Sequence, residues 1–285
     1  MLSHRTVVYI GLAVLAGCAS PSPTDSALDS LTSAERAFAR IASERGIRAS
    51  FIANFADDGI AFDPQPYNLR QTWSLRPPAA DPMAILLEWD PAAAAISRGG
   101  DFGITTGPYL LRNRGSDTPS RVGVFFSVWR RSGVGPWKVA LDAGIQTPSP
   151  VTPEMLVPAP RLGPPPAAAT DDQAALRRIE TQPGGVTPDR YAQTFAEDAR
   201  IYRDEELPIR GTHAIASALV QNGRVTFAPE AIVVAPARDL AYTYGSFTRE
   251  GGKPPKRGYY VHIWTRDGHG DWRIAVAVVL DAPSS

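Results

Sequence analysis

The chain has 285 residues, a length that suits about two domains of ordinary size. Its hydrophobic content of 44% is typical of globular proteins and excludes a largely disordered chain. Lys and Arg together number 29, as do Asp and Glu, so the charge balance gives no reason to expect a nucleic-acid partner.

The N-terminus has the pattern of a targeting segment. A short basic start is followed, over residues 6–17, by an apolar run too brief to span a bilayer as a permanent helix. The run ends in Leu15-Ala-Gly-Cys18, which resembles the lipobox of bacterial lipoproteins. This resemblance implies cleavage before Cys18, a lipid anchor on that cysteine and, because Ala19 follows, residence on the periplasmic side of the outer membrane. An ordinary signal peptide that happens to end near a cysteine is the alternative.

The segment after the cysteine predicts a tether and then helices. Residues 19–30 are rich in Ser and Pro, as flexible tethers are. Thr32-Ser-Ala-Glu35 has the pattern of a capping box, which predicts a helix that starts at Thr32. Apolar residues at four-residue spacing predict a second helix over residues 47–55.

A proline-rich stretch divides the chain. Residues 146–170 hold eight prolines, which fix φ and remove backbone donors, so they predict a semi-rigid linker. We therefore expect a first domain over 31–147, a linker over 148–170 and a second domain over 171–283.

The second half of the chain repeats the first. The clearest repeat is a pair of strands joined by a glycine-rich turn, found at residues 123–144 and again at 258–280. The tryptophans of the two copies lie at a constant offset of 135 residues, as Trp129 and Trp264 show. Two diverged copies of one α+β domain explain this pattern.

A family resemblance rests on these repeats. Phe55-Ala-Asp-Asp58 returns as Phe195-Ala-Glu-Asp198, each after predicted helices and before the strands. This order resembles the nuclear transport factor 2-like superfamily, which includes ketosteroid isomerases and polyketide cyclases. Ile209-Arg-Gly211-Thr-His-Ala-Ile215 is similar to the start of the family's third helix, whereas in the first copy Pro77-Pro78 reduces that helix to residues 82–87. The resemblance implies two tandem cone-shaped domains, each a curved antiparallel sheet wrapped on N-terminal helices.

One face of such a sheet lines a cavity. Strict alternation from a pair of Trp129 with Trp137 puts these residues on the cavity face: Phe125, Ser127, Trp129, Trp137, Val139 and Leu141, and in the second domain Tyr260, His262, Trp264, Trp272, Ile274 and Val276. Tyr242 or Tyr244 on the neighbouring strand is expected to join them. On this alternation Asp142 lies on the opposite face, which argues against it as a general base. A β-bulge would shift each of these assignments by one residue.

His262 is the candidate for acid–base chemistry, because imidazole titrates near neutrality. The alternative is a core or interface histidine bonded to a backbone carbonyl, since Ser127 occupies its place in the first domain. The paired carboxylates at 57–58 and 197–198 are typical of turn chemistry, with a catalytic pair as the alternative.

The opposite sheet faces are apolar and cannot all face water comfortably. They carry Val124, Phe126, Val128, Tyr259, Val261 and Ile263. Domains of this family often pair through their sheets, so the resemblance implies that the two copies form an internal pseudo-dimer.

Several functions lack support in the sequence. Past Cys18 only His213, His262 and His269 remain as histidines, and P-loop, nucleophile-elbow and dinucleotide motifs are missing, so we expect neither metal nor cofactor. We expect a lipid-anchored periplasmic protein whose domains bind a small apolar ligand or serve as interaction modules. The alternative is an isomerase- or cyclase-like enzyme that acts in the second domain through His262.

Overall fold

The computed structural model describes residues 23–156, 159–166, 171–220, 223–251 and 255–283. The expected signal segment and Cys18 lie outside these ranges. Among the helices in the described part of the chain, none is long and apolar enough to cross a membrane.

The first domain places two helices before its strands. Its elements are α1 (Pro23–Arg45), α2 (Ile47–Asn54), β1 (Phe55–Phe62), β2 (Pro66–Asn68), α3 (Leu69–Leu75), β3 (Ile85–Trp89), β4 (Ala93–Ile96), β5 (Phe102–Asn113), β6 (Arg121–Arg130) and β7 (Lys138–Gln146). The short 3-10 helix η1 (Pro153–Met155) follows in the linker.

The second domain repeats this plan. Its elements are α4 (Asp172–Glu180), α5 (Pro188–Gln193), β8 (Phe195–Arg203), β9 (Ile209–Arg210), α6 (Thr212–Leu219), β10 (Val225–Val234), β11 (Leu240–Arg249), β12 (Lys256–Arg266) and β13 (Trp272–Asp281).

The two sheets have matching connectivity. The first runs β2-β1-β7-β6-β5-β3, with β4 also paired to β5, and the second runs β10-β11-β12-β13-β8-β9. β1 pairs with β7 and β8 with β13 in parallel, and the other pairs between described strands are antiparallel. The fold is therefore α+β with two tandem copies, as the sequence predicts.

The first helix starts earlier than the sequence pattern predicts. Residues 23–30, expected as part of a tether, form the first turns of α1, where Ala27 is buried. Thr32 lies inside the helix instead of capping it, and its Oγ1 donates to the carbonyl oxygens of Leu28 and Asp29, each at 3.1 Å. The expected tether is thus in part a packed helix.

The third helix of the first domain also differs from expectation. α3 ends at Leu75, ahead of Pro77-Pro78, and Asn68 caps its start by accepting a 2.8 Å hydrogen bond from the Gln71 N–H. Residues 82–87, the expected place, hold no helix, and β3 begins there. The prolines end the helix rather than displace it to a later position.

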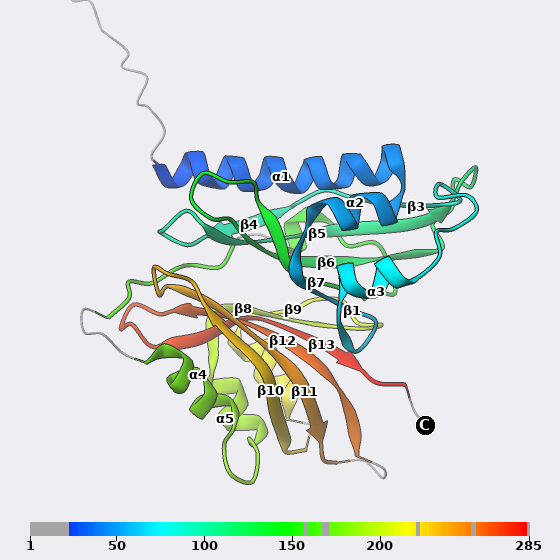
Figure 1. Cartoon of the computed structure of the whole chain (residues 1–285). Helices are drawn as coiled ribbons and strands as arrows, with labels where there is room; N and C mark the ends of the chain where they lie inside the picture. The colour runs from blue at the N-terminus through cyan, green and yellow to red at the C-terminus, as the bar shows by residue number, and fades with distance from the viewer. Residues whose placement is uncertain (1–22, 157–158, 167–170, 221–222, 252–254, 284–285) are drawn as a thin grey trace, which may run out of the picture.

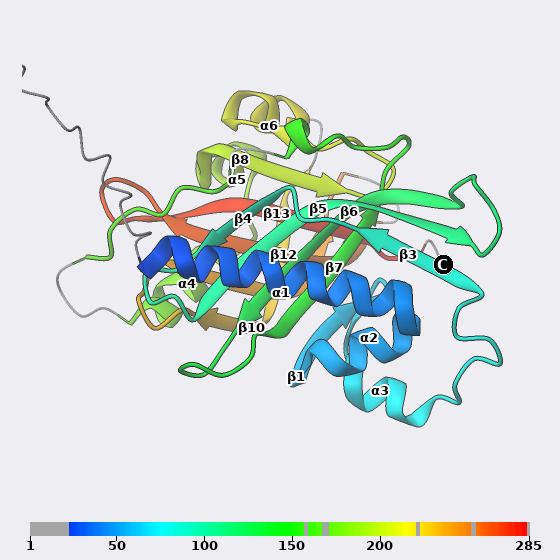
Figure 2. The ribbon, with the colours of Figure 1, turned by 90° about the horizontal axis from the view of Figure 1, so that it is seen from above.

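The molecule has four layers, helices outside and two sheets inside (Figure 1). α1 lies across the first sheet, as the view from above shows (Figure 2), and its Leu31 and Phe38 are buried with Trp129 and Val139 of that sheet. In the second domain α4 packs in the same way, with Leu176 buried against Trp264. Each domain therefore has its own core between helices and sheet.

A third apolar cluster lies between the two sheets. It contains Val124, Phe126 and Val128 from the first sheet and Val261 and Ile263 from the second. Tyr259 is partly buried against the same cluster. The apolar outer faces of the two copies therefore cover each other within one chain.

Tyr242 and Tyr244 belong to this interdomain cluster and not to a cavity. The ring of Tyr242 stacks on Phe102, with centroids 6.0 Å apart, and Tyr244 meets Phe62 edge to face at 5.8 Å. The expectation that either tyrosine joins a cavity in the second domain is wrong, because alternation along β11 points both of them toward the first domain.

Polar contacts also cross between the domains. Asp239 is fully buried, and its carboxylate accepts from Ser97 Oγ at 2.6 Å and from the Arg98 N–H at 2.9 Å. The linker packs as well, since Val151 and Leu156 are buried in the interdomain cluster. The proline-rich segment is therefore part of the packed structure in its described residues.

A β-bulge in each hairpin changes which residues face the helices. Trp129 pairs with Val139 but Val128 pairs with Leu141, so that Ala140 is the extra residue. The same shift occurs at Ala275 in the second domain. Strict alternation fails beyond these two residues. Leu141 and Val276 consequently face the interdomain cluster, and the residues that follow them face the helices.

Candidate functional site

Each domain buries one glutamate that its first helix supplies. Glu35 of α1 is 0% exposed and Glu180 of α4 is 3% exposed. Glu35 Oε2 accepts from Thr105 Oγ1 at 2.5 Å and from Trp129 Nε1 at 2.8 Å. Glu180 likewise accepts from Thr243, which in turn accepts from Trp264 Nε1 at 2.9 Å, so the two copies share a Glu–Thr–Trp arrangement. A carboxylate needs such donors if it is to be buried.

Neither glutamate is among the site residues predicted from the sequence. In the sequence Glu35 has the place of a capping-box residue. It follows Leu31 by four residues and precedes Phe38 by three, so it lies on the same buried face of the helix. The spacing of Leu31 and Glu35 returns in Leu176 and Glu180. A charged residue in an apolar stripe, present in both copies, is the signal that could have found them.

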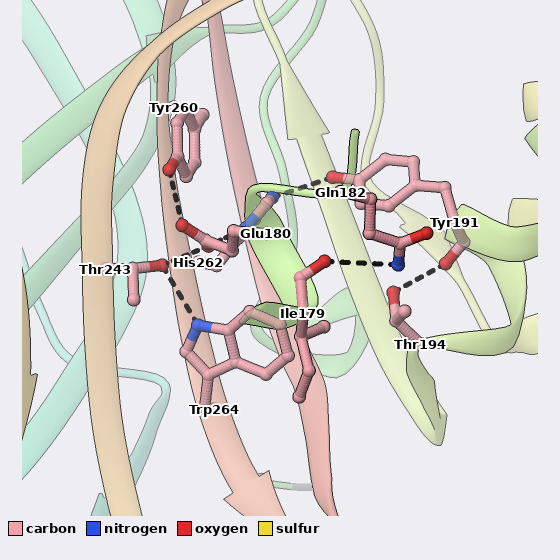
Figure 3. A network of polar contacts seen from close by, with 9 residues as sticks. All are labelled: Ile179, Glu180, Gln182, Tyr191, Thr194, Thr243, Tyr260, His262 and Trp264. Carbon is pink, nitrogen blue, oxygen red and sulfur yellow. Dashed lines mark hydrogen bonds and ion pairs between the residues drawn. The ribbon is translucent and has the colours of Figure 1, made fainter. Parts of the chain in front are cut away.

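The cone of the second domain is closed by a hydrogen-bond network around Glu180 (Figure 3). Tyr260 donates to Glu180 Oε2 at 2.6 Å, and His262 Nδ1 lies 2.8 Å from Oε1. The Tyr191 hydroxyl lies 2.7 Å from His262 Nε2. Both ring nitrogens of His262 therefore have a hydrogen-bond partner within this network.

Little space remains beside this network. The cavity lined by Glu180, Tyr191 and His262 measures about 10 Å³, which is room for about one water molecule. Burial raises the pKa of Tyr191 and of Tyr260 far above the usual range, so both stay protonated. Tyr260, His262 and Trp264 do face the helices as expected, but the space for a substrate at His262 is filled.

The cone of the first domain is open. A pocket of about 200 Å³ lies between helices and sheet. Five aromatic rings line it, together with Asp142, Gly144 and three further residues; the rings belong to Phe38, Phe51, Trp89, Tyr109 and Phe125. An aromatic pocket with few polar groups is the usual form of a small-molecule site.

Three positions on the helix-facing side of the sheets differ in side-chain size between the copies. Register and offset align Tyr260 with Phe125, His262 with Ser127 and Val279 with Gly144. In each pair the second domain has the larger side chain. A Cβ built on Gly144 would lie 3.6 Å from the ring of Tyr109, an ordinary van der Waals distance, so a side chain could be added there without a clash at Cβ.

Asp142 is the carboxyl group among the described residues that line this pocket. Ser127 Oγ donates to its Oδ2 at 2.6 Å. Burial raises the pKa of Asp142 to about 7, against the lowering effect of the Ser127 hydrogen bond, and the nearby Glu35 raises it further. The bulge at Ala140 turns Asp142 toward the helices, so its assignment to the opposite face was wrong.

Glu35 is fully buried and lies close to Asp142. Burial raises its pKa, while hydrogen bonds from Thr105, Trp89 and Trp129 lower it. Trp89 Nε1 donates to Oε1 at 2.6 Å. The charge of Glu35 raises the pKa of Asp142, so the protonation of one carboxyl group affects that of the other.

The mouth of the pocket carries charges of both signs. Arg121 lines it and is exposed. Burial raises the pKa of Tyr109, and the charges of Asp204 and Glu205 raise it further while Arg121 lowers it. The turn after β8 in the second domain therefore places two acidic residues near the mouth of the first domain's pocket.

The described residues contain no group of three or more His, Cys, Asp or Glu side chains that could hold a metal ion. Of the expected site residues, Ser127 and Trp129 belong to the network of the first domain, and Tyr260, His262 and Trp264 to that of the second.

No family model and no curated protein matches this chain. Solved structures with similar folds include a ketosteroid isomerase-like protein from Erwinia carotovora atroseptica, with 13% identity and a TM-score of 0.30 over 39% of this chain and 88% of that one. A Nostoc punctiforme protein of unknown function with a cystatin-like fold has 16% identity and a TM-score of 0.35 over 45% and 95%. An NTF2-like protein of unknown function from Pseudomonas putida has 15% identity and a TM-score of 0.32 over 42% and 85%. At these values the likeness carries no argument about activity.

Proposed function

We propose that the protein binds a small apolar or aromatic ligand in the pocket of the first domain. The observation that carries this proposal is a difference in cavity volume between the two domains. The pocket of the first domain measures about 200 Å³, and the cavity beside His262 in the second domain measures about 10 Å³. The pocket offers aromatic rings for the body of a ligand and the Asp142 carboxylate to orient one polar group. The second domain is then a packed support for the first.

Ligand-observed NMR with 2-phenylethanol as the probe tests this proposal. A chain of residues 19–285 retains every residue that the structure describes in the two domains. We expect saturation transfer from the protein to the probe, and its loss in Gly144→Val, because the valine methyls enter the pocket without strain at Cβ. Val279→Ala is the matched control in the second domain and leaves the signal unchanged. Equal signals from the wild type and Gly144→Val would contradict the assignment.

A second candidate function is proton-transfer catalysis in the same pocket. It is favoured by the position of the Asp142 carboxyl group in the pocket wall, where burial raises its pKa to about 7, a value that suits a general base at neutral pH. Ser127 would hold the carboxylate in place while Asp142 removes a proton from a C–H bond of the bound substrate. This proposal moves the isomerase- or cyclase-like alternative from His262, where space is lacking, to the first domain.

The ring opening of 5-nitrobenzisoxazole tests this second function, because it needs only a base that removes the ring C–H proton as the N–O bond breaks. We expect a rate that rises with pH through about 7, as Asp142 ionises. Asp142→Asn should reduce the rate to that of Gly144→Val. A rate no higher than that of buffer would rule this function out.

We also propose that the protein is anchored by lipid on Cys18 at the periplasmic side of the outer membrane. The support is the motif Leu15-Ala-Gly-Cys18 at the end of an apolar run. α1 begins at Pro23, five residues after Cys18, so an anchored first domain would lie close to the membrane surface.

A further inference from the structure

We propose that the ligand of the first domain's pocket is a protonated amine on a small aromatic or apolar body, with its ammonium group on Asp142. This inference rests on the proposed ligand-binding function and adds the chemical class of the ligand. It is carried by the charges and the rings that surround the pocket.

The side chains that the structure places next to Asp142 are acidic or neutral. Glu35 approaches it from α1, Ser127 from β6 and Tyr67 from β2. The one basic residue in the described lining is Arg121, which is exposed at the mouth. The interior of the cone therefore holds two carboxyl groups without a buried basic partner in its lining, and a cationic ligand would balance them.

The charged residues at the mouth of the pocket do not offset the acidic groups inside it. Arg121, Asp204 and Glu205 all lie near Tyr109. The charge of Arg121 lowers the pKa of Tyr109, whereas the charges of the two acidic residues raise it. Two acidic residues thus accompany the single arginine. A cation that approaches the pocket meets no net positive barrier from these three groups.

The rings provide a second attraction for a cation. The indole of Trp89 lies edge to face with Phe38, at 4.9 Å between centroids, and 6.3 Å and 6.4 Å from Phe51 and Phe125. All four rings line the pocket that contains the Asp142 carboxylate. The faces of aromatic rings attract ammonium groups, most strongly in desolvated sites. An alcohol would gain only the hydrogen bond to Asp142, and a carboxylate would be repelled.

Three probes of similar size distinguish these classes: 2-phenylethylamine, 2-phenylethanol and 3-phenylpropionate. Calorimetric titration of the 19–285 chain at pH 8 should show the amine binding at least about tenfold more tightly than the alcohol. Between pH 6 and pH 8 the ionised fraction of Asp142 grows about tenfold for a pKa of about 7. The affinity for the amine, which stays protonated over this range, should rise by about the same factor.

Asp142→Asn should remove both the preference for the amine and its pH dependence, with less effect on the alcohol. If the alcohol binds as tightly as the amine at pH 8, the ligand is not a cation, and the proposed ligand-binding function still stands. If the carboxylate probe binds best, Arg121 controls the choice and the inference is overturned. If none of the three probes binds at millimolar concentration, the inference and the proposed function both fail. The pH series uses the unmodified side chains, so it does not depend on how any variant folds.

Discussion

Ser127 Oγ donates a 2.6 Å hydrogen bond to Asp142 Oδ2 in the wall of an open pocket, at the place where the second copy sets His262 opposite Ala277. The two copies thus carry different side chains at this pair of facing positions. The first domain has a small hydroxyl and a carboxylate there, and the second has a large imidazole and a methyl group. The titratable groups that face the open space thus belong to the first domain.

The carboxyl group of Asp142 should make the protein less stable as the pH rises. Its pKa is about 7 in the folded chain against a usual value of 3.8, so the folded state binds the proton more tightly than the unfolded state does. Stability contributed by the protonated form is therefore lost as the pH rises above about 4 and through 7. Urea unfolding should show a loss of up to about 3 kcal/mol between pH 5 and pH 8 from this group.

Asp142→Asn tests the origin of that loss, because the amide does not ionise and keeps a similar shape. We expect the variant to be more stable than the wild type at pH 8 and to depend less on pH. Glu35, whose pKa is also raised, leaves part of the pH dependence in place. A variant with an unchanged difference between pH 5 and pH 8 would show that Asp142 is not the source.

Glu180 should be essential for the stability of the second domain. Its removal leaves Tyr260, Thr243 and His262 buried without their shared acceptor. Glu180→Ala should lower the free energy of unfolding by roughly 3–5 kcal/mol. Glu197→Ala, at an exposed position in β8, is the control and should change stability by less than about 0.5 kcal/mol. A small effect of Glu180→Ala in urea unfolding would mean that the network is not closed as described.

The 19–285 chain should be monomeric in solution. Val124, Phe126, Val261 and Ile263 already contact each other's sheets within one chain, so neither apolar face is left for a second copy. Light scattering during gel filtration measures the mass directly. A dominant dimer would contradict the intramolecular pairing that we propose for solution.

Cys18→Ser should release the protein from the membrane. If Cys18 carries the lipid, the variant lacks metabolic labelling by palmitate and leaves the membrane fraction. Ser20→Ala, close to the cysteine but outside the motif, is the control and should stay with the membrane. Unchanged fractionation of Cys18→Ser would refute the lipobox interpretation.

The sequence predicts the fold well because the repeated elements carry it. The hairpin tryptophans Trp129 and Trp264 and the turn glycines between the strands are visible at a fixed offset. Both tryptophans are fully buried in the cores of their domains. The apolar outer strands likewise indicate that a second layer covers them. Such features are local patterns of burial, which periodicity reports directly.

The candidate site could be predicted only in part. Ser127, Trp129 and Trp264 lie on the expected side. The extra residue Ala140 reverses which face of the sheet each later side chain of β7 occupies, so Asp142 could not be assigned to the pocket from the sequence. Alternation cannot reveal a bulge, because a bulge adds no distinctive residue. The volume left inside each cone depends on the summed size of several side chains from different elements. A single residue such as Gly144 therefore does not indicate from the sequence which of the two cones is open.

The cone of the first domain encloses an open pocket, whereas the cone of the second domain is filled. Crystals of the 19–285 chain under xenon pressure test this difference most directly, since xenon enters apolar cavities of sufficient size. We predict xenon density among Phe51, Trp89 and Phe125, and none beside His262. Density beside His262, or none in the first domain, would contradict the account.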